Sequence, residues 1–276
     1  VRSSAASDVY KRQLWNRPKS KGERGYAVDA ILIRSRYKVT HIQHAQDQYA
    51  ALLAVDLESR DKREYLLNVY EGQLVKTYVD SFDRLRHCPA YHRIFMDKGS
   101  LVAVFDAVDG APIDQVFYKG AQVSWQERVD AAQALFHLGL SISDYPPEIA
   151  CAALLSDNLR FWPKEGRLEV QYQVRPMEDM NPREEALLLM DQIKKVLLRR
   201  FSSPKAEIRF LDSLEEQAFL TPVALYSHWL RAKEGIIRDY EALEAKSSLQ
   251  RALYLCFQNL GRWCKRLWKK RKGRKA

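Results

Sequence analysis

The 276-residue sequence contains few cysteines, and they form no recognisable pattern. The four, Cys88, Cys151, Cys256 and Cys264, show no C-x-x-C spacing and no grouped histidine partners. Disulfide frameworks and structural zinc sites both need grouped cysteines, so we expect a reduced, cytoplasmic protein with neither. The six histidines also lack H-x-x-x-H or H-E-x-x-H spacing. We therefore expect no metal and no other cofactor.

Long hydrophobic runs are missing as well. No apolar stretch approaches the roughly 20 residues that a membrane-spanning helix needs, and no secretory signal is visible. The sequence also lacks a Walker A loop, a G-x-S-x-G elbow and a G-x-G-x-x-G motif after a strand, which excludes several common enzyme classes. What is present, 46% hydrophobic and 29% charged residues, is typical of a globular protein with a large core.

Acidic residues are absent from the last fifteen positions. Residues 262–276 contain nine lysines and arginines, and they supply most of the formal net charge of +10. The rest of the chain is close to neutral, so the basic character belongs to a tail at 261–276. The high isoelectric point is therefore no sign that the whole protein binds nucleic acid.

The first residues need separate treatment. "VRSSAASDVYKRQ" resembles translated sequencing-adapter read-through of the kind found in metagenomic reading frames, so residues 1–13 are excluded from the prediction of the fold. Residues 14–36 are polar and basic. We expect residues 1–36 to be an artefact-like and flexible lead-in.

Strand patterns begin at residue 37. β-Branched, aromatic and aliphatic residues predict strands at 37–42, 49–56, 64–71, 92–97 and 100–108. Between the third and fourth, Leu74, Tyr78, Phe82 and Leu85 recur every three or four residues, which predicts an amphipathic helix over 73–87. The order is three strands, one helix and two strands.

Helices dominate after residue 109. Ser124 with Glu127 three residues later forms a capping box and predicts a helix to about residue 142. Asn181 followed by Pro182 predicts the start of another helix. Between them, residues 153–174 read as a loop and two short strands around the turn "PKEG". Most of the remainder reads as helical.

This order resembles the bilobal protein-kinase fold. "LVAVFDAVDGAPIDQVF" is similar to the fifth strand, hinge and following helix of bacterial Ser/Thr kinases, and "ERVDAAQALFHL" resembles the long helix before the catalytic loop. The resemblance covers about residues 37–200. It implies an α+β fold with a five-stranded antiparallel N-lobe and one helix at 37–108, and a mainly helical C-lobe at 109–260. An unrelated α+β domain is the alternative.

The resemblance also implies positions that should hold nucleotide, and these are altered. The loop that covers the phosphates should be rich in glycine, because only glycine lets the backbone approach closely. Here "IQHAQDQYAALLAVD" has no glycine, and Gln43, Ala45 and Gln48 lie near the expected places. Asn68 stands where the third strand should carry its lysine. Asp83, or Asp80, stands for the helix glutamate that would pair with that lysine.

The positions implied for catalysis are altered too. If Asn158 is the asparagine of H-R-D-L-x-x-x-N, then Ala153 replaces the aspartate that accepts the substrate proton. Gln171 or Gln173 replaces the aspartate of D-F-G that holds Mg²⁺. Asn158 could equally be an ordinary turn residue before a strand.

Because phosphoryl transfer depends on these charges, the resemblance implies a pseudokinase and no enzyme. Its expected work is to bind an unknown protein partner as a scaffold or regulator. The alternative is an atypical active kinase that uses displaced acids such as Asp157.

The C-terminal residues predict an amphipathic helix. Its apolar stripe is Leu249, Leu253, Cys256, Phe257, Leu260, Trp263, Cys264 and Leu267. The expected anion-binding residues are Arg262, Trp263, Lys265, Arg266, Trp268, Lys269, Lys270, Arg271 and Lys272. Tryptophan beside clustered cations suits an anionic membrane surface, here the inner membrane face. Two alternatives stay open: the stripe packs on the C-lobe, or the tail binds nucleic acid. Nucleic-acid binding is favoured less, because the rest of the chain lacks aromatic residues spread among basic strands.

Overall fold

The structure is a computed structural model that describes residues 31–178, 180–198 and 200–273. The chain divides into two compact units. The sheet unit comprises the residues up to Asp109 together with Val170–Glu178, and the helical unit comprises Gly110–Glu169 and Asp179–Ala276. The predicted artefact at residues 1–13 lies outside the described residues.

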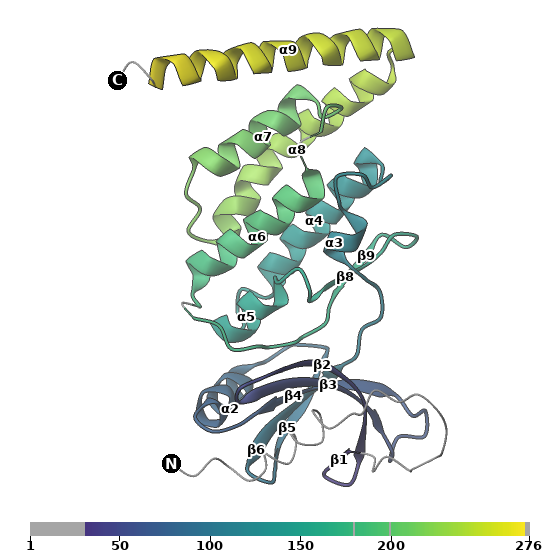
Figure 1. Ribbon diagram of the computed structural model, residues 1–276, viewed down its shortest axis with the longest axis vertical. Coiled ribbons are helices and arrows are strands. Elements are labelled where there is room, and N and C mark those ends of the chain that lie inside the picture. The colour runs from purple at the N-terminus through teal and green to yellow at the C-terminus, as the bar shows by residue number, and fades with distance from the viewer. Residues whose placement is uncertain (1–30, 179, 199, 274–276) are drawn as a thin grey trace, which may run out of the picture. The chain divides into compact units, whose positions relative to one another are not determined.

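The sheet unit is built on one antiparallel sheet whose strands are joined in the order β1-β2-β3-β4-β6-β5 (Figure 1). Its elements are β1 (Leu32–Ile33), β2 (Tyr37–Gln46), β3 (Tyr49–Asp56), β4 (Glu64–Tyr70), α2 (Leu74–Arg84), β5 (Tyr91–Asp97) and β6 (Ser100–Asp106). The helix follows the third long strand, as the hydrophobic period predicts.

The sheet is curled, because residues from opposite ends of the strand order touch. Tyr37 of β2 stacks on Phe95 of β5 with ring centroids 5.9 Å apart and planes 8° from parallel. Three strands separate β2 from β5 in the sheet. The concave face between them holds a core that includes Leu52, Leu67 and Val102. The alternation of side chains along each strand assigns a different set of residues to the other face.

That other face is aromatic and packs against α2, which lies beside the sheet in Figure 1. Tyr78 of α2 stacks on Tyr70 of β4 at a centroid distance of 4.1 Å. Phe82, one turn further on, contacts Phe105 of β6 at 5.9 Å. These are the helix positions that the three-to-four spacing singles out, since residues four apart share one face.

The helical unit contains seven helices among the described residues, and a small sheet of order β7-β8-β9. Its elements are β7 (Ala111–Pro112), α3 (Ile113–Val116), α4 (Trp125–Ser141), α5 (Pro147–Ala153), β8 (Leu159–Trp162), β9 (Arg167–Val170), α6 (Pro182–Leu197), α7 (Lys205–Glu216), α8 (Pro222–Glu244) and α9 (Ser248–Gly273). Helix α4 packs closely on α6 at Gly139, where a Cβ atom would lie 2.6 Å from Leu189 Cδ2.

Both predicted helix starts in this unit are confirmed. Ser124 and Glu127 make a complete capping box at α4. The side chain of Asn181 accepts hydrogen bonds from the backbone N–H groups of Arg183 and Glu184, with Pro182 at the first position of α6. These caps satisfy N–H groups that have no partner within the helix.

The structure differs from the expected organisation in two places. The sheet has six strands and not five, because β1 lies within the stretch read as a flexible lead-in. Ile33 is buried there, but a two-residue strand is too short to produce a detectable period. In addition, residues 170–178 belong to the sheet unit, whereas the sequence placed all of 109–260 in the helical part.

Candidate functional site

The candidate site is centred on Asn68, a polar side chain with no exposed surface in the middle of β4. Its Oδ1 atom accepts hydrogen bonds from the Tyr49 hydroxyl at 2.8 Å and from the Val174 backbone N–H at 2.9 Å. Its amide group donates to the Tyr172 carbonyl at 2.9 Å. A buried amide is stable only when it is hydrogen-bonded, and this one is bonded through both its oxygen and its nitrogen.

Residues 170–174 are therefore tied to the sheet by neutral groups. The Tyr70 hydroxyl donates to the Val174 carbonyl at 2.7 Å. The ring of Tyr172 stacks on Phe105 with centroids 5.3 Å apart. Burial raises the pKa of Tyr70 well above its usual value, so this hydroxyl remains a donor. We call Asn68, Tyr70 and residues 170–174 the neutral clasp.

The two glutamines predicted at the metal-binding position both lie in this clasp. Gln171 is buried, and its Oε1 atom accepts a hydrogen bond from the Val108 backbone N–H at 2.6 Å. Gln173 donates from its side chain to Gln43 of β2. Both amides thus hold residues 170–174 within the sheet unit, and neither carries a charge that could hold a cation.

The acids predicted to pair with the lysine position lie elsewhere. Asp80 and Asp83 are exposed on α2. The buried residues of α2 are Tyr78, Ser81 and Phe82. Neither aspartate is among the hydrogen-bond partners of Asn68, which are Tyr49, Tyr172 and Val174.

The hairpin predicted to cover phosphates is a tight turn between β2 and β3. Gln46 pairs with Tyr49, so the turn consists of two residues only. Ala45 and Gln48 are both exposed, and Gln48 takes a positive φ of 61° without being glycine. The Gln48 carbonyl accepts a hydrogen bond from the Glu71 N–H at 2.9 Å. This contact holds the turn to the residue that follows β4.

The predicted catalytic-loop residues lie in the helical unit. Ala153 is the last residue of α5 and is fully buried. Asn158 is also buried, and its Nδ2 atom donates to the Ala152 carbonyl at 2.7 Å just before β8 begins. Asn158 thus makes a structural contact, as expected for a residue that joins a helix end to a strand. Asp157, the acid proposed as a displaced base, is exposed.

Cys151 lies two residues before Ala153 and has the properties of a core residue. It is fully buried in α5. Burial, with a smaller contribution from Glu185, raises the pKa of its thiol to about 12. A thiol that stays protonated is a poor nucleophile and a poor metal ligand.

The C-terminal helix α9 exposes most of its apolar stripe. Leu249, Leu253, Phe257, Leu260 and Trp263 are exposed, with Phe257 at 71%. Cys256 is exposed as well. At these positions the stripe does not pack on the rest of the described chain, which contradicts the packing alternative. Among the nine predicted anion-binding residues only the side chain of Trp263 belongs to the described part, and it is 59% exposed.

Polar contacts connect the middle of α9 to the rest of the helical unit. Gln258 donates to the Ser203 carbonyl at 2.9 Å, and Asn259 donates to the Phe201 carbonyl at 3.0 Å. Among the described side chains of α9, Leu255 is buried. The first half of α9 is therefore attached along one side, while the described residues of its apolar stripe are exposed.

Membrane spans and metal clusters are both absent from the described part of the chain. No helix in 31–178, 180–198 or 200–273 is both long and apolar enough to cross a bilayer. Within those ranges no group of three or more histidine, cysteine or acidic side chains is placed to hold a metal ion.

Comparisons with known proteins identify the fold. No protein-family model matches the chain, and no curated protein matches its sequence. Among solved structures, the kinase domain of Mycobacterium tuberculosis PknI matches with a TM-score of 0.50 at 10% identity, over 76% of this chain and 98% of that one. A single-residue mutant of the same domain gives 0.50 at 11% identity, over 79% and 100%. Residues 1–466 of Rad53, in complex with AMP-PNP, match with a TM-score of 0.47 at 13% identity, and this chain spans 62% of the Rad53 chain.

The chain thus has a protein-kinase-like α+β fold, with a curled antiparallel sheet in its N-terminal part and helices in its C-terminal part. At these identities the likeness concerns the fold alone. The neutral clasp was not predicted from the sequence, although Asn68 and both glutamines were singled out there one by one. The only signal was the grouping of amides and tyrosines, and contacts between residues more than a hundred positions apart leave no local period.

Proposed function

We propose that this protein is a pseudokinase: it does not transfer phosphate, and it works by binding protein partners as a scaffold or regulator. The observation that carries the proposal is the hydrogen-bonding of Asn68. The resemblance stated from the sequence implies a phosphate-holding lysine at this position, and here a buried neutral amide is bonded to Tyr49, Tyr172 and Val174.

Charge is the reason that this substitution matters. Catalysis of phosphoryl transfer rests on positioning and on electrostatic stabilisation by a lysine and by carboxylate-held Mg²⁺. Asn68, Gln171 and Gln173 are neutral at every ordinary pH. A shift of one or two residues along β4 would not bring a lysine into this place, because Glu64–Tyr70 contains none.

The buried contacts of residues 170–174 support a binding role. In kinases that switch activity, the parts around these positions must move into place. Here Tyr70, Tyr172 and Gln171 hold residues 170–174 on the sheet unit through buried contacts. A segment held by buried contacts suits a protein that presents a surface to its partners.

The test is a thermal-shift measurement on the full chain with millimolar Mg-ATP and Mg-ADP. We expect no change in Tm. A site saturated at a hundred times its dissociation constant would add about 2.7 kcal/mol, which for a chain of this size raises Tm by several degrees. A Mg-dependent rise together with turnover of ATP that disappears in Asp157→Ala would overturn the proposal in favour of an atypical kinase.

A second function, attachment to an anionic membrane surface through α9, is favoured by the exposed apolar stripe. Leu253, Phe257, Leu260 and Trp263 are exposed on one helix that continues into the basic residues 265–272. An apolar stripe beside cations is the pattern of helices that lie in the interface of anionic bilayers. Each cation near such a surface contributes about 1 kcal/mol.

Sedimentation with vesicles tests this second function. We expect the full chain to bind vesicles that contain about 30% phosphatidylserine and not vesicles of phosphatidylcholine alone, with binding that weakens as salt rises. Phe257→Ser with Trp263→Ser should reduce binding at least tenfold. The matched control is Leu230→Ser, an exposed apolar residue of α8. Equal binding by the double variant, or tighter binding to RNA than to vesicles, would contradict it.

A further inference from the structure

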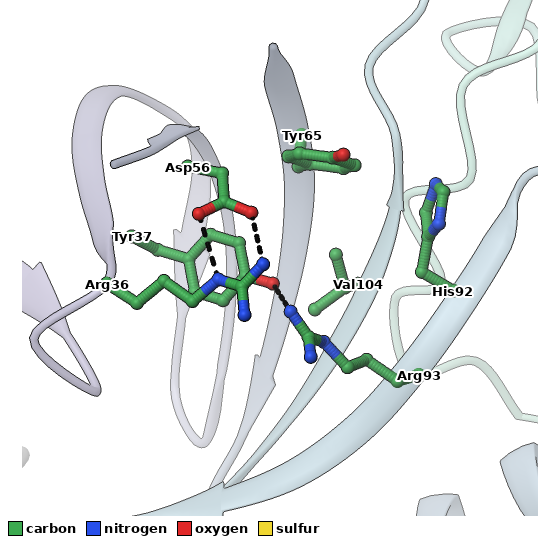
Figure 2. A pocket seen from close by; sticks show the side chains of 7 residues that line it. All are labelled: Arg36, Tyr37, Asp56, Tyr65, His92, Arg93 and Val104. Atoms are coloured by element: carbon green, nitrogen blue, oxygen red, sulfur yellow. Dashed lines mark hydrogen bonds and ion pairs between the residues drawn. The ribbon is translucent and has the colours of Figure 1, made fainter. Parts of the chain in front are cut away.

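A polar pocket opens where the two ends of the curled sheet approach each other. Arg36, Tyr37, Arg93, His92 and Asp56 contribute to a hollow of about 280 Å³ (Figure 2). An adjoining hollow of about 190 Å³ shares Arg36, Tyr37 and Arg93 with it and adds Arg34, Glu58 and Phe95. Both belong to the sheet unit, on the concave side and away from the neutral clasp, which lies on the other face of the sheet.

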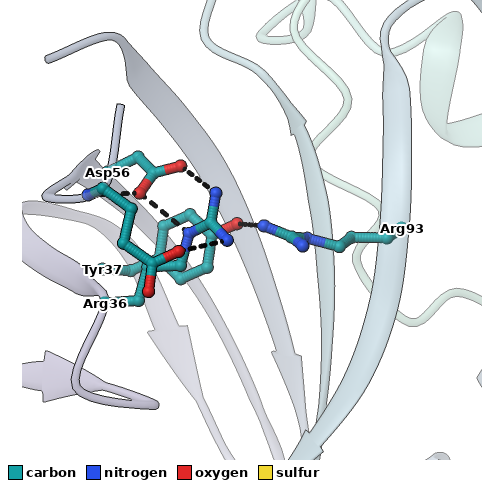
Figure 3. A network of polar contacts seen from close by, with 5 residues as sticks. Arg36, Tyr37, Asp56 and Arg93 are labelled. Atoms are coloured by element: carbon teal, nitrogen blue, oxygen red, sulfur yellow. Dashed lines mark hydrogen bonds and ion pairs between the residues drawn. The ribbon is translucent and has the colours of Figure 1, made fainter. Parts of the chain in front are cut away.

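The two acids that line these hollows, Asp56 and Glu58, both form ion pairs with Arg36. The Arg36 guanidinium donates to both Asp56 oxygens, from Nε at 2.8 Å and from Nη2 at 2.6 Å (Figure 3). Its Nη1 atom lies 2.6 Å from Glu58 Oε2. The bond to Arg36 lowers the pKa of Asp56, so this carboxylate stays ionised. A bidentate pair of this kind is held in a fixed geometry.

Two other arginines have no acidic partner within the described residues. Arg34 lies over the face of Phe95, with its guanidinium carbon 5.1 Å from the ring centroid. Arg93 donates from Nη2 to the Tyr37 hydroxyl and lies over the same tyrosine ring. Because Tyr37 stacks on Phe95, the two guanidinium groups are held against neighbouring rings at the rim of one pocket.

The Tyr37 hydroxyl adds a third donor. Tyr37 is 2% exposed, and its oxygen accepts from Arg93. No acceptor for its own proton is found in the described part of the chain. Figure 2 shows this hydroxyl at the pocket, at the end of the Arg93 side chain. Two guanidinium groups without acidic partners and one hydroxyl donor thus converge on the same space.

We propose that the hollow of about 190 Å³, which Arg34, Tyr37 and Arg93 all line, binds a phosphate monoester. A guanidinium group can donate two parallel hydrogen bonds to phosphate oxygens. A phosphoryl group has three terminal oxygens, so it can accept hydrogen bonds from donors on two sides. The three arginines that line the two hollows outnumber the two acids, and both acids are paired with Arg36, so the local charge stays positive. The proposal is independent of the pseudokinase assignment, since it involves neither Asn68 nor residues 170–174.

Calorimetric titration of the full chain tests the proposal, with inorganic phosphate, a short phosphoserine peptide and the same peptide carrying glutamate instead. We expect phosphoserine to bind, and glutamate to bind at least tenfold more weakly. Tighter binding of the phosphopeptide than of inorganic phosphate identifies a modified protein as the source. Equal binding of the two identifies the free ion or a small phosphate ester.

Two variants and one control assign the site. Arg34→Gln and Arg93→Gln should each weaken phosphate binding at least tenfold. Arg34 contributes a ring contact to the described structure, so its variant remains informative if the loss of the Arg93–Tyr37 contact destabilises the sheet. The control is Arg60→Gln, an exposed arginine of the turn between β3 and β4. Undiminished binding in Arg34→Gln, an equal loss in Arg60→Gln, or no binding by the unaltered chain would overturn the proposal.

The same variants separate the two proposals. A Tm rise caused by Mg-ATP that persists in Arg34→Gln and is accompanied by ATP turnover would count against the pseudokinase assignment and would leave the pocket unaffected. A rise that disappears in Arg34→Gln would mean that the nucleotide phosphates enter this pocket, which supports the phosphate site.

Discussion

Asn68 is the residue that connects the parts of the sheet unit. It bonds β4 to β3 through Tyr49 and to residues 172–174 through two backbone groups. A charged side chain could not take this place without losing its hydration, because the position has no exposed surface. The chemistry of an amide, donor and acceptor in one neutral group, is what the position requires.

Replacing Asn68 by leucine should destabilise the protein by about 3 kcal/mol or more. Leucine has a similar size, but it leaves the Tyr172 carbonyl and the Val174 N–H without their side-chain partner, and each unsatisfied buried group costs about 1–3 kcal/mol. Urea unfolding followed by circular dichroism measures the change. Leu66→Met, a volume-conserving change on the same strand, should cost less than about 1.5 kcal/mol. A loss for Asn68→Leu no larger than this control would mean that the clasp is unimportant.

Glu207 predicts a dependence of stability on pH. It is 1% exposed in α7, and its Oε2 atom accepts a hydrogen bond from the Tyr240 hydroxyl at 2.8 Å. Burial raises the pKa of this carboxyl to about 7. In the unfolded chain it titrates near 4.5, so between these values the folded state binds more protons. Stability from this group is therefore greatest at low pH and falls as pH rises from about 4.5 to 7.

The measurement is the free energy of unfolding of Glu207→Gln relative to the unaltered chain at several pH values. The difference should shift in favour of the variant by up to about 3 kcal/mol between about pH 5 and pH 8, at roughly 1.36 kcal/mol for each pKa unit. Glutamine keeps an oxygen for Tyr240 and carries no charge to bury. A pH-independent difference would show that Glu207 ionises normally in the folded protein. Glu185, whose pKa burial also raises to about 7, is left intact in both proteins.

Among the elements, the helix termini follow local chemistry closely. The Asn181 side chain accepts from two N–H groups at distances of 3.0 and 3.1 Å, and Pro182 needs no partner because it has no N–H. Much of helix α6 is buried, but its first turn depends on this cap.

Asn181→Ala should lower stability by about 1 kcal/mol, since it removes the acceptor for both N–H groups. Asn181→Ser keeps a capping oxygen, so this variant should lose only a few tenths of a kcal/mol of stability. Thermal unfolding of the three proteins compares them directly. Equal losses for alanine and serine would show that the cap does not determine the cost.

The curl of the sheet is a second property of the elements. Tyr37 and Phe95 stack although β2 and β5 lie far apart in the strand order. Strand patterns in the sequence predict each strand, but they contain no information on how far a sheet bends. The phosphate pocket exists because of this bend, so its arginines, which lie at 34 and 93, show no motif in the sequence.

In the molecule as a whole, the sheet unit is discontinuous in sequence. Its main part ends at Asp109, and it is completed by Val170–Glu178 after sixty residues of the helical unit. Those nine residues supply two of the hydrogen-bond partners of Asn68 and the acceptor for the Tyr70 hydroxyl. The helical segment between them must therefore be synthesised before the sheet unit can be complete.

A fragment of residues 1–109 should for that reason be markedly less stable than the same fragment joined by a flexible glycine–serine linker to residues 170–178. The added residues bury Tyr172 against Phe105 and satisfy the amide of Asn68. Thermal unfolding by circular dichroism compares the two, with the nine residues in reversed order as the control. Equal stability of all three fragments would show that the sheet unit is complete without residues 170–178.

Local patterns in the sequence were sufficient to predict the order of the long strands and helices, the caps at Ser124 and Asn181, and the apolar stripe of α9. These features follow from residues within a few positions of one another, whose periods and capping chemistry are local. Three others required the folded chain: Asn68 bonds Tyr172 and Val174, the stripe of α9 stays exposed, and Arg34 meets Arg93 at one pocket. Each depends on contacts between distant residues, and those contacts arise only when the sheet curls and the chain returns to it.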